Sequence, residues 1–109
     1  MTYAEFFADL KGKFMAADVS DIEEHLAYQF NITGEASGIF YIEVKDGVLD
    51  MEPYEYHDRD AMFTCTAKTL KAIESGKLDP EEAVSKEELK VEGDIDKALR
   101  LKELIESHR

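Results

Sequence analysis

Apolar side chains recur at helical spacing near both ends of the chain. Thr2 and Glu5 form a capping box, and large apolar residues then follow three or four positions apart from Tyr3 to Phe14. A second helical pattern opens at Gly93-Asp94 and includes Ile105. Each apolar stripe needs a surface to cover, so the two helices are predicted to pack against a shared core.

Between these helices the period changes to two, which is typical of β-strands. Leu26 to Ile32 alternates, Ile39 to Val44 is apolar at nearly every position, and Val48 to Glu52 alternates again. Lys45-Asp46-Gly47 supplies a hairpin turn between the second and third of these strands. Pro53 removes an amide donor and ends the third strand.

The second half of the chain mixes short helices with short strands. Ala61 to Thr66 predicts a fourth strand, Ala67 to Ser75 a short helix, and Leu89 to Glu92 a fifth strand. Asp79-Pro80 begins another short helix that runs through Val84, with Asp79 as its N-cap. The order predicts an α+β fold over a single domain, residues 1–109, in which a five-stranded, mainly antiparallel sheet is covered on one side by helices.

The charge of the protein narrows the classes of partner. Its 109 residues hold 25 acidic and 13 basic side chains, a formal net charge of −12. Such a charge disfavours binding to nucleic acid and disfavours docking to anionic membranes through clusters of basic residues. Residues 1–57 hold 12 acids and 3 bases, whereas residues 58–109 hold 13 acids and 10 bases, so an anionic ligand should prefer the second half.

Few residues suggest catalysis, metal binding or a membrane span. Gly34 to Gly38 reads G-x-x-S-G, which is not a nucleophile elbow, and His57 to Asp60 lacks the spacing of a zinc or calcium site. Cys65 is the sole cysteine and is predicted to be a buried, inert thiol. We therefore expect no catalytic residue, metal or cofactor, and a cytoplasmic protein without stable membrane insertion. An enzyme that uses Cys65 or a pair of carboxylates is the least favoured hypothesis.

Three segments of the second half resemble a known family. Gly76 to Val84 reads G-K-L-D-P-E-E-A-V, Leu89 to Asp94 reads L-K-V-E-G-D, and Ala98 to Leu101 reads A-L-R-L. This signature, with its spacing, resembles the sterol carrier protein type 2 family, and the strand pattern suits that family from about Ala4 onward. One departure is Glu87, where the family usually has glycine, and it predicts a longer polar turn.

The resemblance implies a hydrophobic tunnel between the sheet and the helices that accepts a fatty acid, an acyl thioester, a sterol or an isoprenoid lipid. The function expected is non-catalytic binding or carriage of such a ligand. The alternative is a protein-interaction or dimerisation module, as a homodimer or as an accessory to a lipid- or quinone-modifying enzyme. The apolar positions predicted to line the tunnel are Phe6, Leu10, Phe14, Phe40, Ile42, Leu70, Ile73, Ile95, Leu99 and Ile105. The basic residues predicted to meet a ligand head group are Lys97, Arg100 and Lys102.

Overall fold

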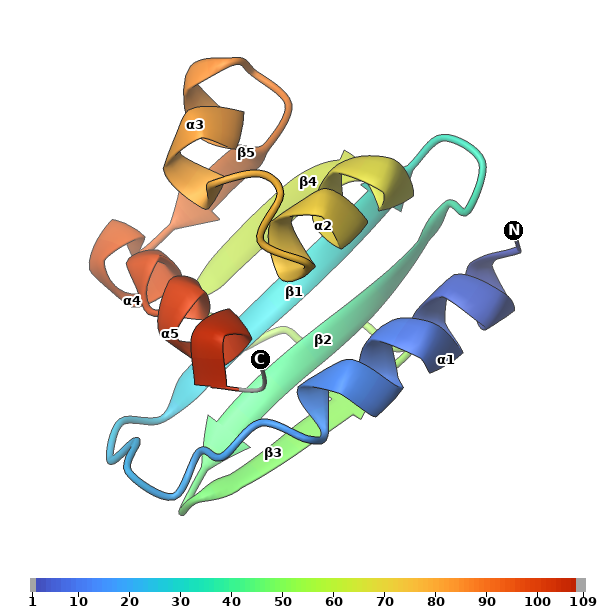
Figure 1. The fold of residues 1–109 in the computed structure, drawn as a ribbon. Helices are drawn as coiled ribbons and strands as arrows, with labels where there is room; N and C mark the ends of the chain where they lie inside the picture. Colours follow the sequence, from blue (N-terminus) through green and yellow to red (C-terminus); the bar gives the residue numbers. More distant parts are fainter. Residues whose placement is uncertain (1, 108–109) are drawn as a thin grey trace.

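A five-stranded sheet carries the helices on one of its faces, in a computed structural model that describes residues 2–107 (Figure 1). The elements along the chain are α1 (Tyr3–Phe14), β1 (Leu26–Thr33), β2 (Gly38–Lys45), β3 (Val48–Glu52), β4 (Ala61–Thr66), α2 (Ala67–Glu74), α3 (Pro80–Ser85), β5 (Lys90–Gly93), α4 (Ile95–Leu99) and α5 (Leu101–Ser107). The strand order is β3-β2-β1-β4-β5. Only β1 and β4 pair in parallel, so the sheet is mixed and mostly antiparallel, which confirms the predicted α+β class.

Local signals in the sequence account for where the elements begin and turn. The Thr2 hydroxyl accepts a hydrogen bond from the Glu5 amide at 3.2 Å, and the Glu5 carboxylate accepts one from the Thr2 amide at 3.1 Å. The predicted capping box is therefore present at the start of α1. Asp46 (φ 53°) and Gly47 (φ 75°) both adopt the left-handed conformation, as a two-residue hairpin turn requires.

The core lies between the sheet and the helices, and aromatic rings form its centre. Phe30 of β1 stacks between Phe40 of β2 and Phe63 of β4, at centroid distances of 4.8 Å and 5.0 Å. Such offset stacking adds to the free energy gained from burying the rings themselves. Helix α1 lies over the β2 and β3 side of the sheet (Figure 1), and its residues Phe6 and Leu10 are buried in this core.

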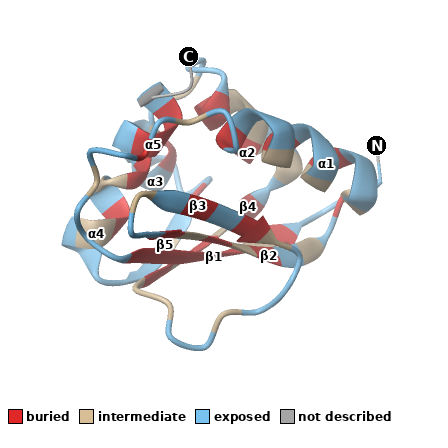
Figure 2. Cartoon of the chain, turned by 90° about the horizontal axis from the view of Figure 1, so that it is seen from below, coloured by how far each residue is buried: buried red, intermediate tan, exposed pale blue. Residues whose placement is uncertain are grey.

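The opposite face of the sheet is crossed by the segment between β3 and β4 (Figure 2). Gln29 is buried beneath this segment, where its side-chain oxygen accepts hydrogen bonds from the Tyr56 amide at 3.2 Å and from Arg59 at 3.3 Å. The Tyr56 hydroxyl also donates to the Glu43 carboxylate at 2.5 Å. These bonds satisfy the buried amide and hold the loop against the strands.

The C-terminal helical pattern forms two helices, α4 and α5, where the sequence predicted one. The chain tightens at Arg100, whose amide donates to the carbonyl three residues earlier, on Lys97, at 3.1 Å. The helix axis changes direction at this turn (Figure 1), and Leu101 and Leu104 of α5 are buried. Their burial stabilises the packing of α5 against the core.

Candidate functional site

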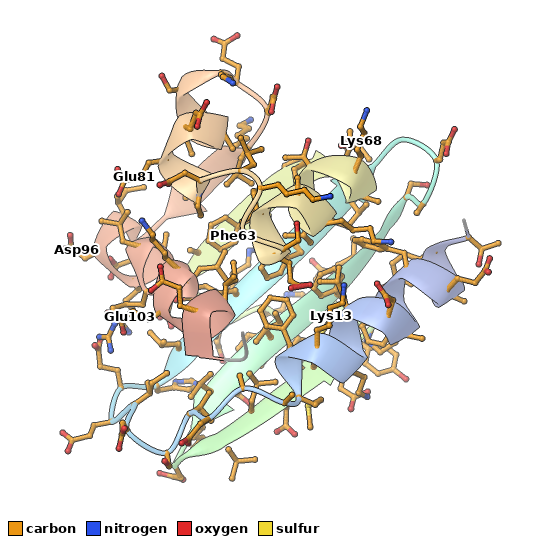
Figure 3. The ribbon with its side chains drawn as sticks, viewed as in Figure 1. Lys13, Phe63, Lys68, Glu81, Asp96 and Glu103 are labelled. Atoms are coloured by element: carbon orange, nitrogen blue, oxygen red, sulfur yellow. The ribbon has the colours of Figure 1, made fainter. Side chains whose placement is uncertain are left out.

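An apolar groove of about 300 Å³ opens at the β5 edge of the sheet, between α3 and the two C-terminal helices. Phe63 of β4 forms part of its wall, and Figure 3 shows this ring on the face of the sheet that the helices cover. The volume is at the lower end of the range for small-molecule sites. The residues that line it are Phe63, Pro80, Glu81, Val84, Leu89, Val91, Ile95, Ala98, Leu99, Leu101 and Lys102.

Three large apolar side chains of the groove are exposed to solvent. Val84 on α3 is 45% exposed, and Ile95 and Leu99 on α4 are 54% and 55% exposed. Single exposed apolar residues are common on proteins, but a cluster of them around one concave surface marks a binding site. The groove therefore has the character of a site for an apolar ligand or an apolar protein surface.

The turn from α3 to β5 places two groove residues, Val84 and Leu89, on either side of a tight bend. The Glu87 amide donates to the Val84 carbonyl at 3.0 Å, and the Glu88 amide donates to the Ala83 carbonyl at 2.9 Å. This pair of bonds is a Schellman motif, which needs a left-handed residue at its centre. Glu87 fills that place with φ of 62°, so the position keeps a glycine-like conformation without a glycine.

Contacts with Tyr28 and Asp60 hold α4 in place. The buried Tyr28 hydroxyl donates to the Lys97 carbonyl at 2.5 Å, and burial raises the pKa of this tyrosine. The Asp94 amide donates to the Asp60 carbonyl at 2.8 Å, and the Lys97 ammonium pairs with the Asp60 carboxylate at 3.2 Å. Neither Asp94 nor Lys97 lines the groove, whereas Ile95, between them in the sequence, does.

The predicted tunnel residues fall into two groups in the structure. Ile95 and Leu99 line the groove. The other eight are almost completely buried in one hydrophobic core: Phe6, Leu10, Phe14, Phe40, Ile42, Leu70, Ile73 and Ile105. Two of these eight, Ile73 and Ile105, also line a second cavity of about 150 Å³ between α2 and α5. A continuous tunnel through the core stays a prediction.

Several groove residues were not named from the sequence, although some carried a signal. Phe63 lies at an inward position of an alternating strand, and Leu89 begins the fifth predicted strand. Leu101 lies on the predicted helix face but was not singled out as a site residue. For Val84 the hydrophobic periodicity held no signal, because one valine in a six-residue helix sets no pattern.

The three predicted head-group residues have different surroundings. Lys102 lines both cavities and pairs with Asp79 at 3.4 Å. Lys97 is held by Asp60, and Arg100 pairs with Glu24 and with Glu103. The structure therefore brings Lys102 to the groove and leaves the other two outside its lining.

Cys65 lies in the core, as the sequence predicted, and burial raises the pKa of its thiol to about 12. At neutral pH this thiol is protonated and unsuited to act as a nucleophile. Within residues 2–107, no group of three or more His, Cys, Asp or Glu side chains is placed to hold a metal ion. No helix in the same range is long and apolar enough to cross a bilayer.

Solved structures of known proteins share this fold. Sterol Carrier Protein-2 from Aedes aegypti, in complex with the C16 fatty acid palmitate, is 22% identical, and the match covers 98% of this chain and 96% of that one with a TM-score of 0.68. The UbiJ-SCP2 ubiquinone synthesis protein is 15% identical over 98% and 95% of the two chains, with a TM-score of 0.71. At these identities the likeness establishes the fold alone.

A larger enzyme contains a domain of the same shape. A double mutant of the sec-alkyl sulfatase PisA1, an enzyme from Pseudomonas sp., is 21% identical and has a TM-score of 0.76. The match covers 95% of this chain but only 16% of the sulfatase chain. The comparison with curated proteins returned no significant match.

The family comparison covers nearly the whole chain. The model of the SCP-2 sterol transfer family matches residues 4–106, which include every strand and the groove. This agrees with the resemblance of the three C-terminal segments. The chain belongs to the SCP-2 sterol transfer family.

Proposed function

We propose that this protein binds a hydrophobic small molecule without transforming it, and that the groove between α3 and α4 is the entrance to the binding site. The observation that carries this proposal is the cluster of exposed apolar side chains at Val84, Ile95 and Leu99 around a concave surface. Membership of the SCP-2 sterol transfer family and the palmitate complex of the Aedes aegypti protein support the same class of ligand. The ligands we consider are fatty acids, acyl thioesters, sterols and isoprenoid lipids.

The size of the groove sets the strength of binding. Burying one methylene contributes about 0.8 kcal/mol, so about eight methylenes contribute about 6 kcal/mol before the costs of ordering the chain. A dissociation constant of tens of micromolar or weaker follows for a ligand confined to the groove. The apolar chain of the ligand lies in the groove, and its polar end lies near Lys102, next to the second cavity that Ile73 and Ile105 help to line.

Leu99→Asp tests the groove directly. Because Leu99 is half exposed, the substitution should leave the fold intact while placing a charge where apolar ligand would lie. We expect the affinity for a fluorescent fatty acid to fall by about tenfold or more. Val48→Asp is the matched control, since Val48 is 59% exposed on β3, at the opposite edge of the sheet from β5.

Native mass spectrometry of the purified protein provides a second measurement, because a retained lipid appears as an added mass. Wild-type protein that shows neither saturable probe binding nor any retained lipid would contradict the proposal. Equal binding by the wild type and Leu99→Asp would show that the ligand does not bind in the groove. The single, buried Cys65 is consistent with a reducing compartment, and we propose the cytoplasm as the place of this function.

A second candidate function is that of an interaction module that acts as an accessory to an enzyme or forms a homodimer. The same three exposed apolar side chains favour it, as does the occurrence of the fold within a sulfatase and in a ubiquinone synthesis protein. Light scattering separates the two functions. A dimer that Leu99→Asp converts to monomers would favour the interaction module, and a monomer that binds lipid would favour the carrier.

A further inference from the structure

Pro80 and Lys102 line both cavities, so the two cavities lie on adjacent sides of these residues. A ligand whose apolar chain lies in the groove and whose polar end faces α2 places that end at these two residues. Lys102 is the one basic side chain among the described residues that line either cavity. The other charged residues there are acidic: Glu81 in the groove, and Asp79 and Glu106 in the second cavity.

Lys102 already forms an ion pair with Asp79. One carboxylate oxygen of Asp79 accepts the Glu81 amide at 2.9 Å and caps α3, while the other lies 3.4 Å from the Lys102 ammonium. The cap fixes the carboxylate in place, so its contact with Lys102 costs little additional side-chain entropy. The Glu81 amide and, to a smaller extent, Lys102 lower the pKa of Asp79, which is therefore ionised at neutral pH.

This pairing affects ligands with different polar ends in different ways. An ionised carboxylate at this position must displace Asp79 from Lys102 or share the ammonium with it, and it also meets the negative charges of Glu81 and Glu106. A hydroxyl has no charge to compensate. It can donate to Asp79 while the ion pair stays intact.

We propose that Asp79, by holding Lys102 between the two cavities, makes this protein prefer hydrophobic ligands with an uncharged polar end over ionised fatty acids. This inference rests on the proposed function, since it concerns ligands of the same groove. It assigns Asp79 as a specificity-determining residue, and the class of ligand favoured is long-chain alcohols and other neutral lipids.

Asp79→Asn tests the assignment because asparagine keeps an oxygen that can cap α3, while an uncharged NH2 group, which can still hydrogen-bond to a ligand hydroxyl, replaces the oxygen that faces Lys102. Binding is measured by displacement of the uncharged dye Nile red with two ligands of equal chain length, dodecanoate and dodecanol. In the wild type, dodecanol should compete at the lower concentration. In Asp79→Asn, competition by dodecanoate should strengthen about two- to fivefold, the range of an exposed ion pair, and that by dodecanol should stay unchanged.

Two further variants complete the design. Lys102→Met should weaken the binding of dodecanoate and leave the binding of dodecanol unchanged. Without the lysine, the remaining negative charge of Asp79 repels the carboxylate of dodecanoate. Glu82→Gln is the matched control: it also removes one negative charge from α3, at a residue paired with Lys86 at 2.9 Å and outside both cavities. This substitution should change the binding of neither ligand. Circular dichroism verifies that each variant is folded.

The outcomes separate this inference from the proposed function. If Nile red and both ligands fail to bind the wild type, the proposed function is wrong and the inference falls with it. If both ligands bind but Asp79→Asn leaves their ratio unchanged, Asp79 does not select the ligand, although the groove still binds lipid. A wild type that prefers dodecanoate to dodecanol would likewise overturn the inference alone.

Discussion

Replacing Glu87 by glycine is expected to stabilise the protein. Glu87 is the central residue of the Schellman motif that ends α3, and its φ of 62° lies in the left-handed region. Its side chain is exposed, so the substitution removes no core packing. The turn joins Val84 to Leu89, which both line the groove, so its conformation also positions part of the site.

Two opposing terms set the size of the effect. A residue with a Cβ in the left-handed conformation costs about 1–2 kcal/mol, and glycine avoids this cost. Glycine in turn makes the unfolded chain more flexible, which costs about 0.5–1 kcal/mol. The net gain should be about 0.5–1 kcal/mol in the free energy of unfolding, a rise in Tm of about 2–4 °C for a domain of this length.

Urea denaturation followed by circular dichroism measures this change, and thermal scans check the shift in Tm. Glu87→Ala is the control, because it removes the same charge but keeps the Cβ and its backbone strain. Glu88→Gly is a second control, since Glu88 has no positive φ and should lose stability on substitution. The reasoning fails if Glu87→Gly is no more stable than Glu87→Ala, which would mean that the left-handed conformation carries no cost here.

Three further predictions concern buried groups and backbone. Tyr28→Phe should lower the free energy of unfolding by about 1–2 kcal/mol, measured by urea denaturation, because the Lys97 carbonyl loses its buried donor; an unchanged stability would show that this bond does not hold α4. Gly93→Ala should cost about 2–3 kcal/mol in the same assay, since φ is +102° and the new Cβ would lie 2.5 Å from the Asp60 carbonyl oxygen; a neutral effect would contradict this close approach. Iodoacetamide at about pH 8 should alkylate Cys65 only in unfolded protein. As the folded pKa of this thiol is raised from 9.0 to about 12, the free energy of unfolding should also fall as the pH rises above 9.0, because the unfolded state loses its proton first.

The boundaries of the elements could be predicted from the sequence because short-range contacts set them. The capping box of Thr2 and Glu5 involves residues three positions apart, and the hairpin turn needs only Asp46 and Gly47 in left-handed conformations. Asp79 likewise caps α3 through the amide of Glu81, two residues further on. Such interactions depend on local chemistry and hold whatever the rest of the chain does.

Periodicity predicted which side chains turn inward but not what they meet there. Phe6 and Phe40 were predicted to line a tunnel, and in the structure both are buried in the hydrophobic core. Phe63 had the same inward pattern, yet its ring also forms part of the wall of the groove beside α3. An inward position therefore has the same sequence signal in a core as in a ligand site.

The sequence by itself determined the acidic charge, the element order, the family and the inward face of each strand. Only the tertiary structure decided that β4 lies parallel to β1, that the last helix breaks at Arg100, and that Lys102 reaches the groove while Lys97 is held by Asp60. The physical reason is distance along the chain. Lys102 meets Asp79 across 23 residues and Lys97 meets Asp60 across 37, so the choice between these partners is made by packing and not by any local pattern.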